Sequence, residues 1–304
     1  MHGRRRAHRD ENLNETLAAA FRHIEGSAVG SDSEHDLKGL FDDLDVNSSK
    51  LGSTVAKRNE QLAKLLDAIG DLSLGDFADN TIDAFGDAYE YLMTMYASSA
   101  GKSGGEFFTP QEVSELLARI TVVGKTEVNK VYDPACGSGS LLLKFAKVLG
   151  KDNVRQGFFG QEVNLTTYNL CRINMFLHDI NFEKFDIAHG DTLIDPAHWD
   201  DEPFEAIVSN PPYIPSADPH LAALTHEPLQ ALASGSDGLD DIRTIVIQAP
   251  ARLAPGGWLL LEHGYDQAEA VQALLVAQGF VQVQSRNDLA GIARCTGGQW
   301  PTVK

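Results

Sequence analysis

The chain has 304 residues, of which 43% are hydrophobic and 22% charged, and its formal net charge at pH 7 is −18. The composition is typical of a soluble globular protein, and the length allows one large domain with a smaller appendage. The acidic charge argues against a chain that grips DNA by itself, because phosphate neutralisation normally supplies much of the affinity for DNA. No apolar run approaches the roughly 20 residues of a membrane-spanning helix, so we expect no membrane contact.

Residues 1–110 are predicted to form a helical N-terminal region. The start, from Met1 to Arg9, is basic and lacks the apolar core of a signal peptide, which favours a cytoplasmic protein. Apolar residues recur with helical spacing from Leu13 to Ile24 and from Leu51 to Leu66. A further helix is expected from Phe85 to Met95. The small and polar residues from Ala97 to Gly105 then predict a loop.

From residue 111 to residue 304, strand-like and helix-like segments alternate, which predicts one catalytic domain with a doubly wound α/β fold. Ligands of such parallel sheets bind at the carboxyl ends of the strands. The expected strands are 131–133, 157–161, 185–189, 206–209, 258–262, 280–284 and 292–295, the last followed by a turn at 296–300. The expected helices are 141–149, 166–178, 242–253 and 267–278.

A glycine-rich turn, Asp133-Pro-Ala-Cys-Gly-Ser-Gly-Ser, joins the first expected strand to a helix. Gly137 and Gly139 let the backbone turn sharply and approach a ligand, and the N–H groups at the helix start can receive a carboxylate. No phosphate-binding loop of the G-x-x-x-x-G-K-[ST] type is present. The alternative interpretation is a plain strand-to-helix turn. The Asp-Pro pair before the glycines makes the motif more specific for a ligand-binding loop than Gly-x-Gly alone.

Two acidic residues end the next strands. Glu162 can accept hydrogen bonds from the ribose hydroxyls of a nucleoside, or it is a solvent-facing glutamate. Asp191 can accept from an adenine amino group, or it caps the next helix.

The tetrapeptide Asn210-Pro211-Pro212-Tyr213 follows an apolar strand and is the most informative motif. The two prolines stop the strand and stiffen the backbone, which fixes the Asn210 side-chain oxygen and the Pro211 carbonyl as two acceptors. Two acceptors aimed at one NH₂ group suit an amine whose lone pair is delocalised into a ring or a carbonyl. Tyr213 offers a flat face for stacking. The alternative interpretation is a rigid turn.

Gly105-Glu-Phe-Phe-Thr-Pro lies just before the catalytic domain. Phe107 and Thr109 are candidates for a lid over a nucleoside pocket. The alternative is a hydrophobic staple with a helix cap, and both roles are compatible. The three cysteines, Cys136, Cys171 and Cys295, form no C-x-x-C pair, so the sequence predicts neither a metal site nor a disulfide framework.

These motifs together resemble the amino-methyltransferases in which the cofactor loop precedes Asn-Pro-Pro-Tyr. From about residue 30 to Tyr213 the chain resembles the modification subunit of type I restriction-modification systems. That family makes N6-methyladenine in DNA and relies on a separate specificity subunit, so the resemblance implies DNA as a partner through such a subunit. The resemblance is carried by Leu37-Lys-Gly-Leu-Phe, Phe85-Gly-Asp-Ala-Tyr-Glu-Tyr, Gly101-Lys-Ser-Gly-Gly-Glu-Phe-Phe-Thr-Pro, Tyr132-Asp-Pro-Ala-Cys-Gly-Ser-Gly-Ser-Leu-Leu-Leu, Gly157-Phe-Phe-Gly-Gln-Glu, Thr167-Tyr-Asn-Leu and Asn174-Met-Phe-Leu-His.

After Tyr213 the resemblance changes to the release-factor glutamine N5-methyltransferases. That family methylates the glutamine of a Gly-Gly-Gln loop, so a peptide-chain release factor is the alternative partner. We interpret the chain as a hybrid of the two families with a junction near residues 210–214. This second resemblance is carried by Ile214-Pro-Ser-Ala-Asp-Pro-His-Leu, Glu227-Pro-Leu-Gln-Ala-Leu, Asp237-Gly-Leu-Asp-Asp-Ile, Gly256-Gly-Trp-Leu-Leu-Leu-Glu-His-Gly and Asp288-Leu-Ala-Gly.

Both resemblances imply a class I S-adenosylmethionine-dependent methyltransferase fold with S-adenosylmethionine as cofactor and no metal. Three hypotheses remain open: a DNA adenine methyltransferase component, a protein glutamine methyltransferase, and a cofactor-binding hybrid without turnover. The residues expected to act on the target are Asn210, Pro211 and Tyr213. The residues expected to bind the cofactor are Phe107, Thr109, Asp133, Gly137, Gly139, Glu162, Asp191 and Asn210.

Overall fold

The computed structural model describes residues 10–71, 111–122, 124–198, 203–223, 229–288 and 290–302. The chain divides into two compact units, Met1–Phe85 and Gly86–Lys304, and each is described here by itself. Phe107 and Thr109, together with the helix and loop expected between residues 85 and 105, lie outside the described residues. The domain boundary at residue 110 stays a prediction.

The described part of the first unit has a small helical core. Leu13 and Leu62 are buried in one cluster. The buried side chain of Asn59 links two helices, since its amide donates to the backbone oxygen of Glu11 at 2.6 Å and its oxygen accepts from the backbone N–H of Asn14 at 3.0 Å. The helices are α2 (Leu13–Ser27), α3 (Glu34–Leu37) and α4 (Val55–Asp71).

The helix predicted to begin at Leu51 begins four residues later, because the backbone N–H of Leu51 closes a turn on the oxygen of Ser48 at 3.1 Å. The apolar pattern also predicted a wider buried face on α2 and α4 than the structure has. Ile24, Val55 and Leu65 fit the helical spacing, yet their exposed fractions are 43%, 44% and 55%. Helical spacing places residues on one side of a helix, but only the neighbouring helix decides how wide the covered strip is.

The second unit contains a seven-stranded sheet in the order β3-β2-β1-β4-β5-β7-β6. The first five strands in this order are parallel, and β7 is antiparallel to both of its neighbours. This is the doubly wound α/β arrangement expected from the alternation of strands and helices. The strands are β1 (Val128–Asp133), β2 (Val154–Glu162), β3 (Phe185–His189), β4 (Phe204–Ser209), β5 (Leu253–Glu262), β6 (Val281–Asn287) and β7 (Ala293–Gln299).

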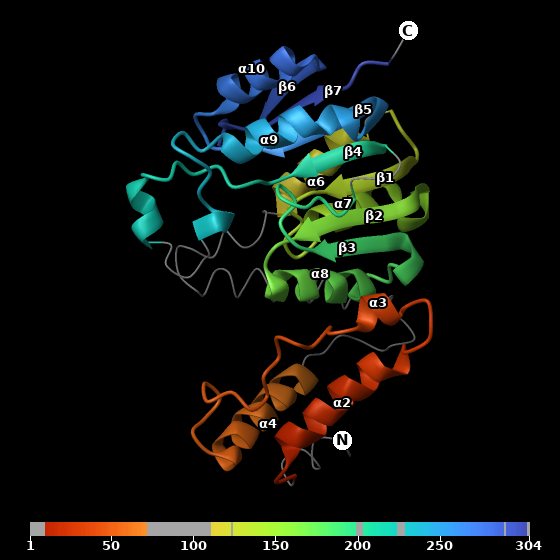
Figure 1. Cartoon of the computed structure of the whole chain (residues 1–304), viewed down its shortest axis with the longest axis vertical. Coiled ribbons are helices and arrows are strands. Elements are labelled where there is room, and N and C mark those ends of the chain that lie inside the picture. Colours follow the sequence, from red (N-terminus) through yellow and green to blue (C-terminus); the bar gives the residue numbers. More distant parts are fainter. Residues whose placement is uncertain are drawn as a thin grey trace. The chain divides into compact units, whose positions relative to one another are not determined.

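Helices cover both faces of the sheet (Figure 1). One hydrophobic cluster joins the sheet to α6, α7 and α8, and a second joins it to α9 and α10. The helices are α6 (Gln111–Thr121), α7 (Ser140–Leu149), α8 (Leu165–Leu177), α9 (Asp240–Gln248) and α10 (Ala268–Gln278). Short 3-10 turns lie at η1 (Lys151–Asn153), η2 (Phe182–Lys184), η3 (Pro219–Ala223), η4 (Leu229–Ala231) and η5 (Ala249–Ala251).

The core runs across the junction inferred near residues 210–214. Strand β4 pairs with β1 on one side and with β5 on the other. Its side chains alternate, so that Val208 enters the cluster of α7 and Ile207 enters the cluster of α9. Ile242 of α9 is completely buried in the same cluster as Tyr132 of β1. The two parts of the chain therefore share one packed interior.

Two sequence expectations about the C-terminal elements are wrong. The helix expected over 242–253 ends at Gln248, because Pro250 has no N–H to continue the helical ladder. The segment expected to turn after residue 295 instead remains in β7 up to Gln299. Its glycines serve close packing rather than a turn, since a Cβ on Gly297 would lie 2.8 Å from the Leu259 oxygen and one on Gly298 would lie 2.9 Å from Phe280 Cβ.

The shared interior predicts a clear contrast between two isoleucines of α9. Ile242 is buried and Ile247 is 64% exposed. Ile242→Ala should lower the free energy of unfolding by about 2–5 kcal/mol, because it leaves a cavity in a close-packed core. Ile247→Ala, the matched control, should change it by less than about 0.5 kcal/mol. Urea unfolding followed by circular dichroism measures both, and equal small effects would mean that α9 is not packed on the sheet.

Candidate active site

The carboxyl ends of four parallel strands meet at one edge of the sheet. Asp133 and Glu162 end β1 and β2, and Glu262 ends β5. Asn210 follows β4, and because Ser209 pairs with Leu261, Asn210 lies one register step further, opposite Glu262. The topology thus gathers most of the sequence-predicted residues at the edge where ligands of such sheets bind.

The glycine-rich loop has the sharp backbone turn expected from its sequence. Gly137 has φ +53° and Gly139 has φ +81°, values that residues other than glycine rarely adopt. A Cβ on Gly139 would lie 2.6 Å from Cys171 Sγ, so this glycine is needed for the close approach of α7 and α8. A Cβ on Gly137 would meet no heavy atom within 4 Å among the described residues. The backbone of the loop at Gly137 is therefore accessible to a ligand.

Asp133 is a buried carboxyl group beneath this loop, with a residue exposure of 2%. Its Oδ1 accepts a hydrogen bond from the backbone N–H of Ala135 at 3.0 Å. The pKa of Asp133 is raised to about 7, mainly by burial and to a lesser extent by the nearby Glu162, while the hydrogen bond from Ala135 opposes the shift. The side chain therefore shapes the loop, although removing its carboxyl group from water is energetically unfavourable.

Glu162 closes the loop from the neighbouring strand. Its Oε2 accepts from the backbone N–H of Gly137 at 2.9 Å, and its Oε1 accepts from the backbone N–H of Asn164 at 2.8 Å. Asp133, Gly137 and Glu162 are therefore brought together. Each carboxylate oxygen can accept more than one hydrogen bond, so these contacts leave acceptor capacity for a ligand hydroxyl.

Asp191 is exposed and organises the turn that follows β3. Its Oδ1 accepts from the backbone N–H of Leu193 at 2.9 Å, and its backbone oxygen accepts from Asp195 at 2.8 Å. Among the described residues no helix follows Asp191 before β4, so these contacts order a turn rather than cap a helix. The turn is held from β2, where the buried Gln161 donates to the oxygen of Asp195 at 2.9 Å and accepts from Ala197 at 3.0 Å.

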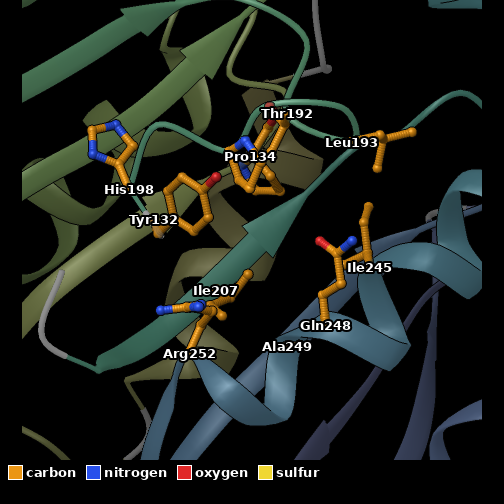
Figure 2. Close-up of a pocket in the computed structure, with 11 residues that line it drawn as sticks. Tyr132, Pro134, Thr192, Leu193, His198, Ile207, Ile245, Gln248, Ala249 and Arg252 are labelled. Atoms are coloured by element: carbon orange, nitrogen blue, oxygen red, sulfur yellow. The ribbon is translucent and has the colours of Figure 1, made fainter. Parts of the chain in front are cut away.

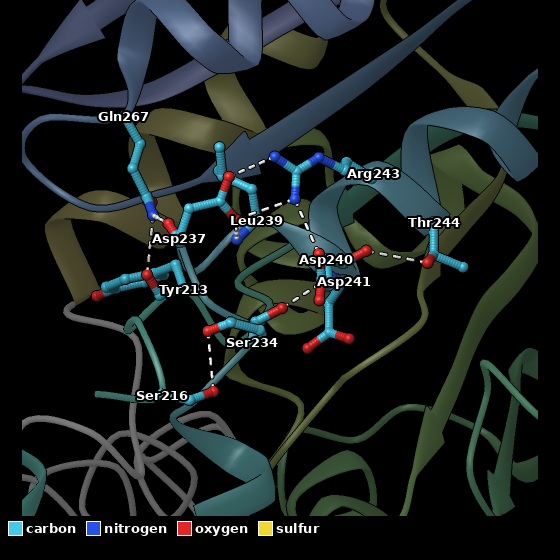
Figure 3. Close-up of polar contacts among 11 residues, drawn as sticks. Tyr213, Ser216, Ser234, Asp237, Leu239, Asp240, Asp241, Arg243, Thr244 and Gln267 are labelled. Atoms are coloured by element: carbon cyan, nitrogen blue, oxygen red, sulfur yellow. Dashed lines mark hydrogen bonds and ion pairs between the residues drawn. The ribbon is translucent and has the colours of Figure 1, made fainter. Parts of the chain in front are cut away.

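Gln267 fixes Tyr213, the last residue of the Asn-Pro-Pro-Tyr motif (Figure 3). Its Nε2 donates to the backbone oxygens of Tyr213 at 2.9 Å and of Asp237 at 3.1 Å, and its Oε1 accepts from the backbone N–H of Gly264 at 2.7 Å. Gly238 packs against the same carbonyl, where a Cβ would lie 2.1 Å from the Tyr213 oxygen. Three chain segments thus meet at the backbone of Tyr213.

Charged and hydroxyl side chains tie the segment that precedes α9 to the start of that helix. Arg243 forms ion pairs with Asp237 and with Asp240 (Figure 3). The Ser234 hydroxyl accepts from the backbone N–H of Asp241 at 2.7 Å, and the Ser216 hydroxyl donates to the Gly235 oxygen at 2.8 Å. These bonds give the loop downstream of Tyr213 a defined course.

A cavity of about 460 Å³, which includes space open to solvent, lies beside the sheet near α9 (Figure 2). Its walls include Tyr132, Ile207 and Arg252. Side chains alternate along a strand, and Tyr132 and Ile207 belong to the α9 cluster, whereas their neighbours Val131 and Val208 belong to the α7 cluster. Of the sequence-predicted site residues that the structure describes, none lines this cavity.

Sequence reasoning missed three features of this edge. Gln161 and Gln267 hold loops through side-chain amides, and a single glutamine in a sequence carries no signal of such a role. Cys136 and Cys171 lie far apart in the chain, yet their Sγ atoms are 4.0 Å apart as free buried thiols. Among the described residues, no three His, Cys, Asp or Glu side chains gather as metal ligands, and no helix is long and apolar enough to cross a membrane.

Residues 80–224 match the family model described as N-6 DNA Methylase. The chain is 52% identical over 215 residues to the type I restriction enzyme MpnII methylase subunit of Mycoplasma pneumoniae, an alignment that covers 67% of this chain and 39% of that protein. A solved structure of the type I restriction-modification system methyltransferase subunit from Streptococcus thermophilus superposes with a TM-score of 0.69 at 28% identity, covering 96% of this chain and 62% of that chain.

The chain is also similar to release factor glutamine methyltransferases. It is 56% identical over 110 residues to that of Pseudomonas aeruginosa, covering 34% of this chain and 40% of that protein. It is 36% identical over 193 residues to that of Neisseria gonorrhoeae, covering 63% of this chain and 68% of that protein. The chain thus spans about two fifths of the Mycoplasma and Pseudomonas relatives, 39% and 40% respectively.

The burial of Asp133 predicts a pH dependence of stability. Its pKa rises from an ordinary 3.8 to about 7 in the folded protein, so the native state binds more protons between these values, and stability falls as pH rises through them. Asp133→Asn keeps the acceptor for Ala135 and removes this titration. Its free energy of unfolding should therefore fall less over that range than that of the wild type.

Urea unfolding at several pH values checks the effect of Asp133→Asn. The exposed Asp152 provides the matched control, and Asp152→Asn should follow the pH profile of the wild type. Identical profiles for the two variants would contradict a desolvated carboxyl group at Asp133.

Proposed function

We infer that this chain, which belongs to the family of the release factor glutamine methyltransferases and carries an N-6 DNA methylase domain over residues 80–224, is an S-adenosylmethionine-dependent N-methyltransferase. The observation that carries the inference is the position of Asn210-Pro-Pro-Tyr213 directly after β4, at the edge of the sheet that also holds the glycine-rich loop. This position supports a donor site and an acceptor site on neighbouring strand ends.

The residues of the glycine-rich loop fit S-adenosylmethionine. The backbone at Gly137 is open where a Cβ would otherwise stand, and the loop leads into the N-terminus of α7, which favours a ligand carboxylate. Glu162 retains acceptor capacity for ribose hydroxyls. We assign Asp133, Gly139 and Asp191 to shaping this site, with Phe107, Thr109 and Asn210 completing it.

Catalysis in this proposal depends mainly on alignment. S-adenosylmethionine would supply an electrophilic methyl group and would leave as the neutral thioether S-adenosylhomocysteine. The Asn210 side-chain oxygen and the Pro211 carbonyl accept hydrogen bonds from the two N–H groups of the target NH₂, which directs its lone pair toward that methyl group. Tyr213 stacks on the planar target. After transfer the nitrogen loses its extra proton to water, so no side chain has to act as a general base.

We propose adenine in DNA as the first target. The N-6 DNA methylase match and the 52% identity to a type I methylase subunit support this choice. An adenine in a duplex has to be flipped out to reach Asn210. Since the chain has a net charge of −18, DNA affinity has to come from a partner, for which we propose a specificity subunit.

The second candidate target is the glutamine side chain of a peptide-chain release factor. The 56% identity over 110 residues to a release factor glutamine methyltransferase favours it, and so does the acidic charge. An amide NH₂ presents the same planar donor geometry to Asn210 and Pro211. We propose that the chain is a hybrid of two related methyltransferases, joined where both carry Asn-Pro-Pro-Tyr.

Cofactor binding at the glycine-rich loop is tested with Gly137→Trp. The indole should fill the open space over the loop, so titration calorimetry should show at least about a 100-fold loss of S-adenosylmethionine affinity, equal to about 2.7 kcal/mol. Gly124→Trp is the matched control, because Gly124 also has a positive φ, +75°, and open space at its Cβ. Equal affinities in the two variants would show that the cofactor binds elsewhere.

Methyl transfer is tested with labelled S-adenosylmethionine on DNA, with and without a specificity subunit, and on a release factor. Asn210→Ala should lower kcat by about 100-fold or more while cofactor affinity changes little, since the lost acceptor acts in the transition state. The exposed Asn287 gives the control Asn287→Ala, which should keep full turnover. Transfer to neither substrate by the wild type would leave a cofactor-binding hybrid without activity.

A further inference from the structure

One arginine side chain lies between the phenol of Tyr213 and a buried carboxyl group at the end of β5. The Nη2 atom of Arg294 donates to the Tyr213 hydroxyl oxygen at 3.1 Å. The same atom lies 3.7 Å from Oε1 of Glu262. The guanidinium carbon is 5.5 Å from the centre of the Tyr213 ring, within the range of a cation–π contact.

The carboxyl group of Glu262 is held out of water. The side chain is 4% exposed, and its Oε2 has no hydrogen-bond partner among the described residues. Burial raises the pKa of Glu262 to about 7, and Arg294 opposes this shift. The contact between Glu262 and Arg294 is largely shielded from water, so the attraction between the two groups holds the guanidinium of Arg294 at this position.

The backbone of Arg294 is fixed as well. Its oxygen accepts a hydrogen bond from the backbone N–H of His263 at 3.0 Å, which joins β7 to the end of β5. Tyr213 is therefore held at two points, with its carbonyl on Gln267 and its hydroxyl on Arg294. Two fixed ends restrict both the position and the tilt of the ring.

We propose that Arg294 is a positioning residue for Tyr213, anchored by Glu262, and that this trio sets the orientation of the ring on which the planar target stacks. The inference rests on the proposed function in one respect, that Tyr213 faces the target. Arg294 touches neither cofactor nor target in this assignment. Its effect on methyl transfer passes through Tyr213.

The first experiment needs no turnover. The protein is labelled with ¹³C on its tyrosine rings, and the Tyr213 resonance is assigned by its loss in Tyr213→Phe. Arg294→Lys keeps the positive charge beside Glu262 but lacks the planar group that reaches both partners, so the Tyr213 resonance should move. Arg286→Ala, on the adjacent strand β6, is the control and should leave the resonance unchanged. An unmoved Tyr213 resonance in Arg294→Lys overturns the inference.

The second experiment measures turnover on whichever substrate the wild type methylates. Arg294→Ala should lower kcat about 10- to 100-fold, the range expected for a lost charged hydrogen bond. Cofactor affinity should stay at the wild-type value, and Arg294→Lys should restore part of kcat. In a Tyr213→Phe background, Arg294→Lys should cost little further, because the hydroxyl that it orients is gone. Full additivity of the two substitutions overturns the inference.

The two proposals fail in different ways. If the wild type methylates neither DNA nor a release factor, the proposed function fails, and the tyrosine resonance alone decides whether Arg294 orients Tyr213. If the wild type is active but Arg294→Ala changes only stability or cofactor affinity, the proposed function stands and Arg294 has a structural role instead.

Discussion

The pairing of β4 with β1 on one side and β5 on the other is the constraint on which the site depends. Strand β4 carries Asn210 at its end, and its register brings Ser209 beside Leu261 and Tyr132 beside Ile207. A slip by one residue would exchange the two faces of the strand and turn Val208 away from the α7 cluster. The buried side chains of both clusters therefore fix where the strand ends, and with it the position of Asn210, the residue proposed to contact the target amine.

The same edge of the sheet concentrates desolvated acidic groups. Asp133 and Glu262 are both nearly completely buried, and burial raises the pKa of each to about 7. Such groups reduce the stability of the folded chain at neutral pH. They are tolerated because each orders something nearby, the loop at Ala135 in one case and the guanidinium of Arg294 in the other. The stability of the fold and the geometry of the site are thus coupled through the same residues.

The junction inferred near residues 210–214 divides the candidate site into two sides. The loop of Gly137 and its partner Glu162 come from the part similar to type I methylase subunits. The contacts that hold Tyr213, from Gln267 and Arg294, come from the part that follows the junction. In the proposed function, a chain joined at this point keeps the donor side of one family and supplies the acceptor side with the supports of the other. The proposal therefore assigns target selection to elements after β4 and cofactor binding to elements before it.

The sequence by itself determined the parallel strands from β1 to β5, the sharp turn at the glycine-rich loop and the fixed end of β4. These depend on local properties, such as apolar periodicity, the positive φ that glycine permits and the missing N–H of proline. The tertiary structure decided the rest. The sequence paired the last two strands but did not show that β7 inserts between β5 and β6. Nor did it show that Gln267 and Arg294 meet at Tyr213, because such contacts arise only when segments far apart in the chain pack together.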